Sequence, residues 1–241
     1  MLGDIVETRT FLNRVLSKEG NYCVFAFRTR DDRRIQKFYS SIDHVVDMAS
    51  NLDKEGYDAY FALATFNEAG SRKVDNVKEL NSFFLDLDCG LGKDYKTQEE
   101  AIQALKSFCM RFKLPRPTMI NSGRGVHVYW FLTEPVGLQN WLSVSGRLKA
   151  LCSQHNLLAD PAVTADAARV LRIPNTHNYK TDPPSKVGLF GNEMAEAIHI
   201  NYFAELLGED VMQVPQKRNQ QKNPTLDGLR DNIESVLKNI L

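Results

Sequence analysis

The sequence predicts a protein of the mixed α/β (α+β) class. Apolar runs typical of strands alternate along the chain with segments whose apolar residues recur at helical spacing. Apolar residues make up 43% of the 241 residues and charged residues 25%, which is an ordinary balance for a globular protein. A chain of this length can bury a core without disulfides. The same length predicts one large domain or two small ones.

The first half of the chain is predicted to alternate between helices and strands. The expected elements are, in order, a helix at 4–19, a strand at 22–28, an amphipathic helix at 40–56, a strand at 59–66, a polar turn at 67–73 and a strand at 82–88. Ser41 is a good N-cap for the second helix, and Gly56 follows the end of that helix.

The second half begins with a strong helix signal at 96–112. Thr97 and Glu100 form a capping-box pattern, and apolar residues from Ala101 to Phe112 share one face. The later expected elements are a hairpin at 117–132 with the turn "SGRG" at 122–125, a long helix at about 137–155, a short strand at 187–190 and a mixed or helical segment at 196–208.

The composition changes near the C-terminus. Residues 213–224, "QVPQKRNQQKNP", have almost no apolar content and are predicted to be a linker. Residues 225–241 then carry apolar side chains at helical spacing. We therefore predict a main domain at 1–212, and a C-terminal helix that either packs on this domain or begins a further helical domain.

Charge and cysteine content narrow the class of protein. The formal net charge is zero, so any contact with a polyanion must come from a local cluster of basic residues. The four cysteines form no CxxC pair, which disfavours a zinc ribbon, and their wide spacing fits a reducing compartment. The N-terminus is too acidic and polar for a signal peptide, and no apolar run is long enough to span a membrane. We expect a cytoplasmic protein.

The stretch "SFFLDLDCG" at 82–90 places two carboxylates at the end of an apolar strand. Because side chains alternate along a strand, Asp86 and Asp88 should point to one face and Leu85 and Leu87 to the other. Neighbouring carboxylates repel each other, and a hard divalent cation such as Mg²⁺ or Mn²⁺ removes the repulsion. The alternative is a solvated strand end at which both acids face water.

The stretch "NSGRGVHVYWF" at 121–131 combines a glycine-rich turn with a histidine. Gly123 and Gly125 flank Arg124, and such a turn is expected to expose backbone N–H groups to an anion. His127 follows on the same strand face as Tyr129. These features predict a phosphate contact. The alternative is an ordinary hairpin turn followed by a structural histidine.

The stretch "LADPAVTADAARVLRIPNTHNYK" at 158–180 places acids before cations. It holds Asp160 and Asp166, then Arg169, Arg172 and Lys180. This order suggests an acid for a metal ion followed by cations for a polyphosphate, and the alternative is a solvated helix face and loop. Together, the three stretches match a two-metal phosphoryl-transfer site.

In this order the three stretches resemble the motifs of the archaeo-eukaryotic primase superfamily, most closely the primase-polymerases of phages and plasmids. The resemblance covers about residues 20–205. It implies an RRM-like catalytic sheet packed with an N-terminal α/β module. It also implies that Asp86, Asp88 and Asp160 bind two metal ions, Mg²⁺ or Mn²⁺, with Asp166 as the alternative third ligand. The residues implied to contact the nucleotide are Ser122, Arg124, His127, Arg169, Arg172 and Lys180.

The implied activity is template-directed nucleotidyl transfer by a DNA primase or polymerase. Its implied partners are a single-stranded DNA template, NTP or dNTP, and a fused or separate helicase, in the cytoplasm of a bacterial or archaeal host cell. Two features depart from the family. A small hydroxylated residue often stands two positions before the histidine, where this chain has Gly125, and this chain lacks the cysteines of the zinc module that some members carry.

Two other classes of protein remain open from the sequence. A replication initiator could use the same fold to recognise DNA without catalysis, although it would not need three acidic positions. A nuclease or a DxD glycosyltransferase could also use the acid pair. In a glycosyltransferase, the cations at 169–180 would be mere surface charge.

Overall fold

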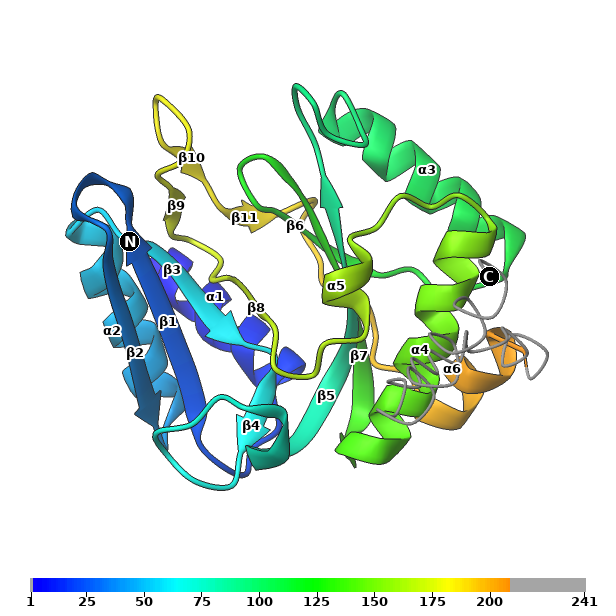
Figure 1. Cartoon of the computed structure of the whole chain (residues 1–241), viewed down its shortest axis with the longest axis horizontal. Coiled ribbons are helices and arrows are strands. Elements are labelled where there is room, and N and C mark those ends of the chain that lie inside the picture. The colour runs from blue at the N-terminus through cyan, green and yellow to red at the C-terminus, as the bar shows by residue number, and fades with distance from the viewer. Residues whose placement is uncertain (1, 209–241) are drawn as a thin grey trace, which may run out of the picture. The chain divides into compact units, whose positions relative to one another are not determined.

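Two antiparallel sheets organise residues 2–208, the part of the chain that the computed structural model describes (Figure 1). All of these residues belong to one unit. The predicted linker at 213–224 and the predicted helix at 225–241 lie outside the described residues, so both stay predictions. No helix within residues 2–208 is long and apolar enough to cross a membrane.

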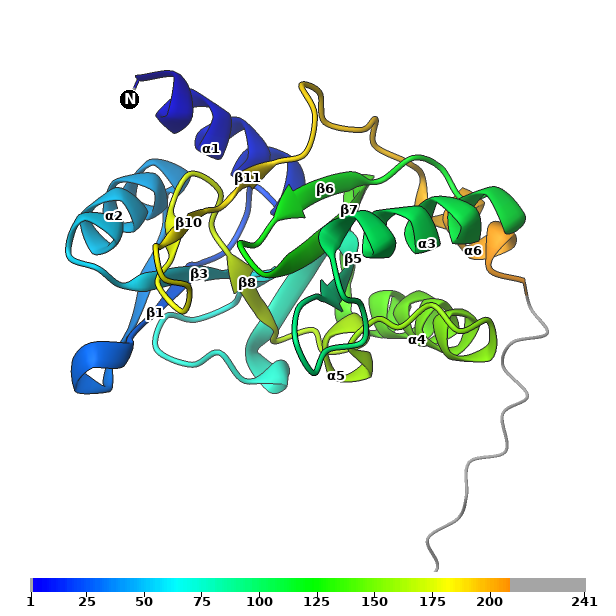
Figure 2. The ribbon, with the colours of Figure 1, turned by 90° about the horizontal axis from the view of Figure 1, so that it is seen from above.

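The first sheet has the strand order β2-β1-β3-β8 and is backed by two helices. In Figure 1, α1 and α2 lie behind its strands, and in Figure 2 they lie above them, so these two helices cover the same face. The elements of this half are α1 (Leu2–Val15), β1 (Tyr22–Arg28), β2 (Arg33–Tyr39), α2 (Ile42–Lys54), β3 (Asp58–Ala62) and β8 (Val170–Arg172).

The second sheet has the order β11-β6-β7-β5-β4 and carries the two longest strands. Its elements are β4 (Ala64–Phe66), β5 (Val77–Asp88), α3 (Gln98–Arg111), β6 (Thr118–Asn121), β7 (Gly125–Gly137), α4 (Leu138–Gln154), β11 (Gly188–Leu189) and α6 (Ile200–Leu206). The remaining elements are two short 3-10 turns (Thr29–Asp31 and Val74–Asn76), α5 (Pro161–Thr164) and the pair β9 (His177–Asn178) and β10 (Ser185–Lys186).

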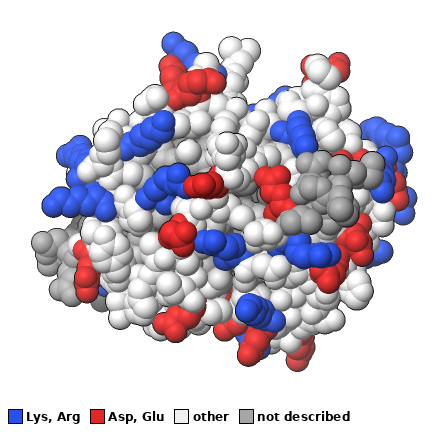
Figure 3. Space-filling model, turned by 180° about the vertical axis from the view of Figure 1, so that it is seen from behind, with Lys and Arg blue, Asp and Glu red and all other residues white. Residues whose placement is uncertain are grey.

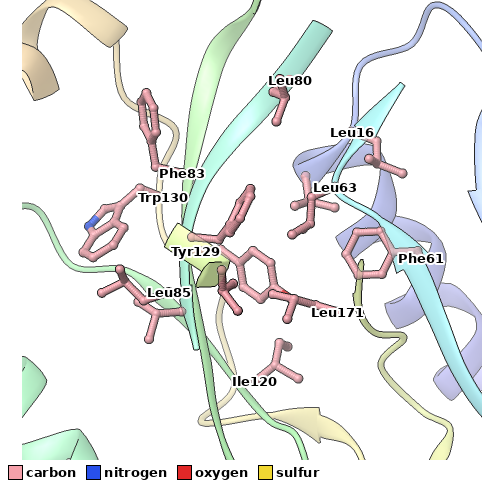
Figure 4. Close-up of a cluster of buried hydrophobic side chains, with 14 of the residues drawn as sticks. Leu16, Phe61, Leu63, Leu80, Phe83, Leu85, Ile120, Tyr129, Trp130 and Leu171 are labelled. Carbon is pink, nitrogen blue, oxygen red and sulfur yellow. The ribbon is translucent and has the colours of Figure 1, made fainter. Parts of the chain in front are cut away.

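A single core joins the two sheets. Phe11 of α1 is 2% exposed, and its ring centroid lies 5.9 Å from that of Phe61 in β3 and 5.1 Å from that of Tyr129 in β7. Figure 4 shows Phe61 and Leu171 from the first sheet on the Tyr129 side of the second sheet. Such interlocking aromatic rings hold the relative position of two layers, and therefore of any site between them.

The opposite side of the second sheet packs against helices. Phe83 of β5 stacks on Trp141 of α4 at 6.0 Å and on Phe203 of α6 at 5.1 Å. Figure 4 shows Phe83 and Trp130 together on this side. The apolar half of "SFFLDLD" is thus fixed in the core, which gives the strand end a rigid support.

The predicted class, a mixed α/β (α+β) protein with an N-terminal α/β module, is confirmed, and so are the two predicted helix caps. The Ser41 hydroxyl accepts a hydrogen bond from Asp43 N at 3.2 Å, and the Thr97 hydroxyl accepts one from Glu100 N at 3.2 Å. The Glu100 carboxylate accepts from Lys96 N at 2.7 Å, one residue before the position that a reciprocal capping box would use.

Three of the differences between the structure and the predicted elements concern the sheets. The edge strand β2 was not predicted, because its sequence "RRIQKFY" is polar and mostly exposed, as suits a sheet edge. The predicted strand at 59–66 divides at Leu63 into β3 and β4, which belong to different sheets. The strand predicted at 82–88 begins earlier, at Val77.

Candidate active site

A cleft of about 720 Å³ lies where the open face of the first sheet meets the end of β5. It gathers all the residues predicted to bind metal or nucleotide, except the alternative ligand Asp166. Its lining includes Asp86, Asp88, Ser122, Arg124, His127, Asp160, Arg169, Arg172 and Lys180. Residues more than 90 positions apart in the chain therefore meet in one cavity, as the three stretches predict.

The acid pair and the histidine are cross-strand neighbours. Asp86 pairs with His127 and Asp88 pairs with Gly125 in the β5–β7 register. Leu85 is fully buried, whereas the carboxylate of Asp86 is 18% exposed and that of Asp88 is 42% exposed. The predicted alternation is thus present, and it directs both carboxylates into the cleft.

The position of Asp86 is unfavourable for a negative charge. Burial, followed by the charges of Asp88 and Asp160, raises the pKa of Asp86 from 3.8 to about 7. A divalent cation stabilises such a cluster because it offsets the repulsion and supplies the solvation that burial removes. The hard oxygen donors present therefore fit Mg²⁺ or Mn²⁺.

Asp160 reaches the pair through the backbone. Its N–H donates to the carbonyl oxygen of Asp86 at 2.9 Å, which fixes the start of α5 beside the strand end. One carboxylate oxygen of Asp160 caps α5 by accepting from Ala162 N at 2.8 Å, and the other lies 3.8 Å from Arg169. Asp166 instead caps its own turn, accepting from Ala168 N at 2.9 Å. Between the two acids, the position of Asp160 favours it as a ligand.

The carboxylates do not form a closed cage. Within residues 2–208, no three His, Cys, Asp or Glu side chains stand close enough together to hold a metal ion by themselves. Mg²⁺ typically keeps several waters and is bound through one or two carboxylates plus the phosphates of a substrate. The Asp86–Asp88 pair fits that mode of binding better than a site made wholly of protein ligands.

Lys93, which was not among the predicted site residues, lies at the acid pair. Lys93 Nζ is 2.7 Å from Asp88 Oδ2. The loop that carries it is held by Tyr95, whose hydroxyl accepts from Leu158 N at 3.0 Å. The sequence signal for this contact is weak, because it consists of two lysines soon after the second aspartate in "DCGLGKDYK". The sequence alone does not show that the loop folds back onto Asp88.

The glycine-rich turn is closed by its own hydrogen bonds. Gly123 N donates to Asn121 Oδ1 at 2.8 Å, and Gly125 N donates to the Ser122 hydroxyl at 3.0 Å. The N–H groups of the two glycines are therefore satisfied within the turn and are not available to an anion. Asn178 of β9 fastens the turn from outside, donating to the Ser122 carbonyl at 2.9 Å and accepting from Lys180 N at 3.0 Å.

Gly125 is required by the close approach of two strands. A Cβ on this residue would collide with the carbonyl oxygen of Leu87, which lies between the two aspartates in β5. The small hydroxylated residue that often stands at this position in the archaeo-eukaryotic primase superfamily would therefore not fit here. We infer that the absence of a side chain lets β7 lie flat against the strand that holds the acids.

Gly125→Ala is expected to lower the free energy of unfolding by about 1–3 kcal/mol, because the backbone oxygen cannot move without breaking the β5–β7 pairing. Gly146→Ala in α4 is the matched control. Within residues 2–208, no atom outside its chain neighbours and the backbone of its own helix lies within 4 Å of its added Cβ, so this change should raise stability by roughly 0.5–1 kcal/mol. Urea unfolding of both variants measures the difference, and equal effects of the two changes would contradict the steric argument.

His127 is neutral at physiological pH. Burial, aided by the charges of Arg172 and Arg169, lowers the pKa of His127 to about 3. Its Nε2 lies 3.9 Å from Asp86 Oδ1, and its Nδ1 is a buried atom with no hydrogen-bond partner within residues 2–208. A neutral imidazole still offers one N–H donor, so the geometry suits a hydrogen bond to a substrate oxygen rather than an ion pair.

The predicted cations divide into exposed and buried ones. Lys180 and Arg124 are exposed, and the Arg124 guanidinium donates to the carbonyl oxygen of Lys180 at 2.7 Å. Arg169 is 37% exposed. Arg172 differs, because it is 6% exposed and forms an ion pair with the fully buried Asp58. Its charge is therefore largely offset within the protein.

Comparisons with known proteins show the fold. No protein-family model matches the chain. A replication protein of Clostridium perfringens is 30% identical over 149 residues, which are 61% of this chain and 35% of that protein. The matched region thus spans about a third of the relative.

Solved structures match over most of the chain. The archaeo-eukaryotic primase domain of the cyanophage S-2L primase-polymerase aligns with a TM-score of 0.63 and 17% identity, over 85% of this chain and 98% of that one. Primase RepB′ aligns at 0.57 with 12% identity, over 98% and 68% of the two chains. The RepB′ catalytic domain, in complex with initiator DNA, aligns at 0.54 with 14% identity, over 88% and 99%.

These likenesses define the class of protein by its fold. The chain has the fold of these primase and primase-polymerase domains, which is the fold that the three sequence stretches imply.

Proposed function

We propose that the chain is a primase-polymerase domain that joins nucleotides on a single-stranded DNA template in DNA replication. One observation carries the proposal: the Asp86–Asp88 pair and Asp160 meet in a cleft whose other charged residues are cations. The Clostridium relative, whose name is "Replication protein", supports the same role.

The acidic end of the cleft suits the metal ions. Asp86 and Asp88 would hold them, with Asp160 as the third ligand. When bound, divalent ions at such a site lower the pKa of an attacking hydroxyl and offset the charge of the leaving pyrophosphate. The buried strand β5 keeps the two carboxylates in place, so little ordering is needed when a substrate arrives.

The cationic part of the cleft suits a triphosphate. Arg169, which lies 3.8 Å from Asp160, and the exposed Lys180 line the cleft, and Arg124 adds a planar fork of donors. His127 would donate one N–H to a phosphate oxygen, as a neutral group. Lys93 would give up its contact with Asp88 to the incoming metal ion and contact a phosphate oxygen instead. Either NTP or dNTP fits this description.

The Lys93–Asp88 ion pair favours a second candidate function. Lys93 offsets the charge of Asp88 without a metal ion. This would suit a replication initiator that uses the fold for DNA recognition without catalysis. The two functions differ in whether the carboxylates bind a metal ion, so metal affinity separates them.

Titration with Mn²⁺ should give a carboxylate-dependent binding signal in calorimetry. Asp88→Asn is expected to abolish the signal, and Lys93→Ala is expected to strengthen it, because the competing cation is removed from Asp88. Lys78→Ala is the control, since this lysine pairs with Glu19 and does not line the cleft. A wild-type protein that binds no Mn²⁺ would favour the initiator.

The proposed activity is tested with labelled NTPs and dNTPs on single-stranded DNA. The expected products are short oligonucleotides, or extended primers, that form only with Mg²⁺ or Mn²⁺. Degradation of the DNA instead would indicate a nuclease, and transfer from UDP-sugars would indicate a glycosyltransferase.

A further inference from the structure

One face of the first sheet is covered by no helix from residues 2–208, and aromatic side chains line it. Residues directly opposite in antiparallel strands share a face, so Gln36, Phe25, Tyr60 and Arg172 form one row across β2, β1, β3 and β8. Phe27 and Arg34 form the next pair on the same face. Figures 1 and 2 place α1 and α2 on the other side of the sheet.

Burial confirms which face is open. Val24 and Ala26, which alternate with the two phenylalanines in β1, are fully buried beneath the helices. Phe25, Phe27 and Tyr60 are only partly buried. Large aromatic rings that remain partly exposed on a sheet face need an explanation, since burying them would stabilise the fold.

The row is continuous with the cleft. Tyr60 lines the cleft, and its ring lies 6.0 Å from that of Phe25. Phe25 and Phe27 then continue the surface onto β1, the next strand of the sheet. We call Phe25, Phe27 and Tyr60 the aromatic face.

Basic side chains border the aromatic face. The Arg34 guanidinium lies 5.6 Å above the Phe27 ring, and that of Arg172 lies 4.8 Å from the Tyr60 ring. Arg72, from the loop before β5, donates to Gln36 at 3.4 Å. The charge of Arg172 is offset by a buried acid, whereas Arg34 and Arg72 keep theirs. Asp58 is buried against Arg172, and Asp32 forms an exposed pair with Arg34, which contributes little.

We propose that the aromatic face binds the single-stranded template beside the cleft, with bases stacked on Phe25 and Phe27 and the backbone near Arg34 and Arg72. The identification of the strand as a template rests on the proposed function. Exposed rings with bordering cations are typical of surfaces that bind single-stranded nucleic acid, whose bases offer free π-faces, whereas a duplex keeps its bases stacked internally. Seen from behind, the molecule has basic and acidic side chains interspersed on its surface (Figure 3).

Binding is measured by fluorescence anisotropy with a labelled oligo-dT, in EDTA and without nucleotides. Phe25→Leu and Phe27→Leu keep apolar bulk but remove the ring. Each is expected to weaken binding roughly 5- to 150-fold, the range for loss of one base–aromatic stack. Phe25→Trp should retain the wild-type affinity. Tyr202→Ala is the control, because this ring on α6 is 51% exposed and lies outside the row.

The outcomes separate this inference from the proposed function. If both leucine variants fold and bind within twofold of the wild type, the aromatic face is not the binding surface, whatever the activity of the protein. If the leucine variants lose binding while the wild type makes no product, the surface is confirmed and the polymerase proposal fails. Equal weakening by Tyr202→Ala would also overturn the inference, because the effect would not be specific to the row.

Discussion

Asp86→Asn and Asp88→Asn are each expected to lower nucleotide incorporation by roughly 10²- to 10³-fold or more, because each removes a charge that holds the metal ions. Asparagine keeps the shape of the side chain, so the β5–β7 pairing should survive. The measurement is the initial rate of incorporation on single-stranded DNA at saturating Mn²⁺. A folded variant that polymerises at the wild-type rate would contradict the assignment.

The third acidic position has a matched control in the same segment. Asp160→Asn should also lose activity, since its carboxylate lies in the cleft. Asp166→Asn should not, because asparagine keeps the oxygen that accepts from Ala168 N. The reverse result would make Asp166 the ligand.

Asp86→Asn should not weaken the fold. The pKa of Asp86 is raised in the folded state, so this residue destabilises the metal-free protein increasingly as pH rises from about 4 through about 7. In EDTA, Asp86→Asn should therefore be at least as stable as the wild type at pH 7. Loss of activity together with equal or higher stability would identify a functional charge rather than a structural one.

Arg172→Met is expected to destabilise the protein by about 3–5 kcal/mol, because it leaves Asp58 as an uncompensated buried charge. This corresponds to a fall in Tm of roughly 10 °C for a chain of this size. Thermal unfolding measures the effect. The double variant Asp58→Asn with Arg172→Met should lose much less than the sum of the two single changes, because neither charge is left unpaired.

Arg172 is also one of the residues implied to contact the nucleotide. The ion pair with Asp58 gives the residue a structural task, and Asp58 also accepts from Tyr179 N at 2.9 Å, which ties β9 to the first sheet. If Arg172→Met stays within about 1 kcal/mol of the wild type while the KM for nucleotide rises tenfold, the arginine acts on the phosphate directly.

Local periodicity was sufficient to predict the acid pair and its support. Alternation along one strand places Asp86 and Asp88 on a single face, and the same rule places His127 on one face of its strand with Tyr129. These predictions needed only the strand assignment. The order of the three stretches then predicted that Asp160 would join them, although no local rule gives the backbone bond from Asp160 N to Asp86.

The parts that could not be predicted depend on contacts between distant segments. Lys93 reaches Asp88 because Tyr95 fastens the loop to residue 158. Arg172 is buried because β8 pairs with β3 beside Asp58, which the sequence presents as an unremarkable acid. The turn at 122–125 has the glycines of an anion site, but Asn121 and Ser122 satisfy its amides. In each case a distant or competing partner decides the role.

Whether Asp86 and Asp88 hold the metal ions needed for polymerisation is tested most directly by one measurement. Labelled nucleotides, single-stranded DNA and Mn²⁺ are incubated with the wild type and with folded Asp88→Asn in parallel, and product lengths are scored. We predict metal-dependent products from the wild type and none above background from Asp88→Asn. Equal product from both proteins, or none from a wild type that binds DNA and Mn²⁺, would contradict the proposed site.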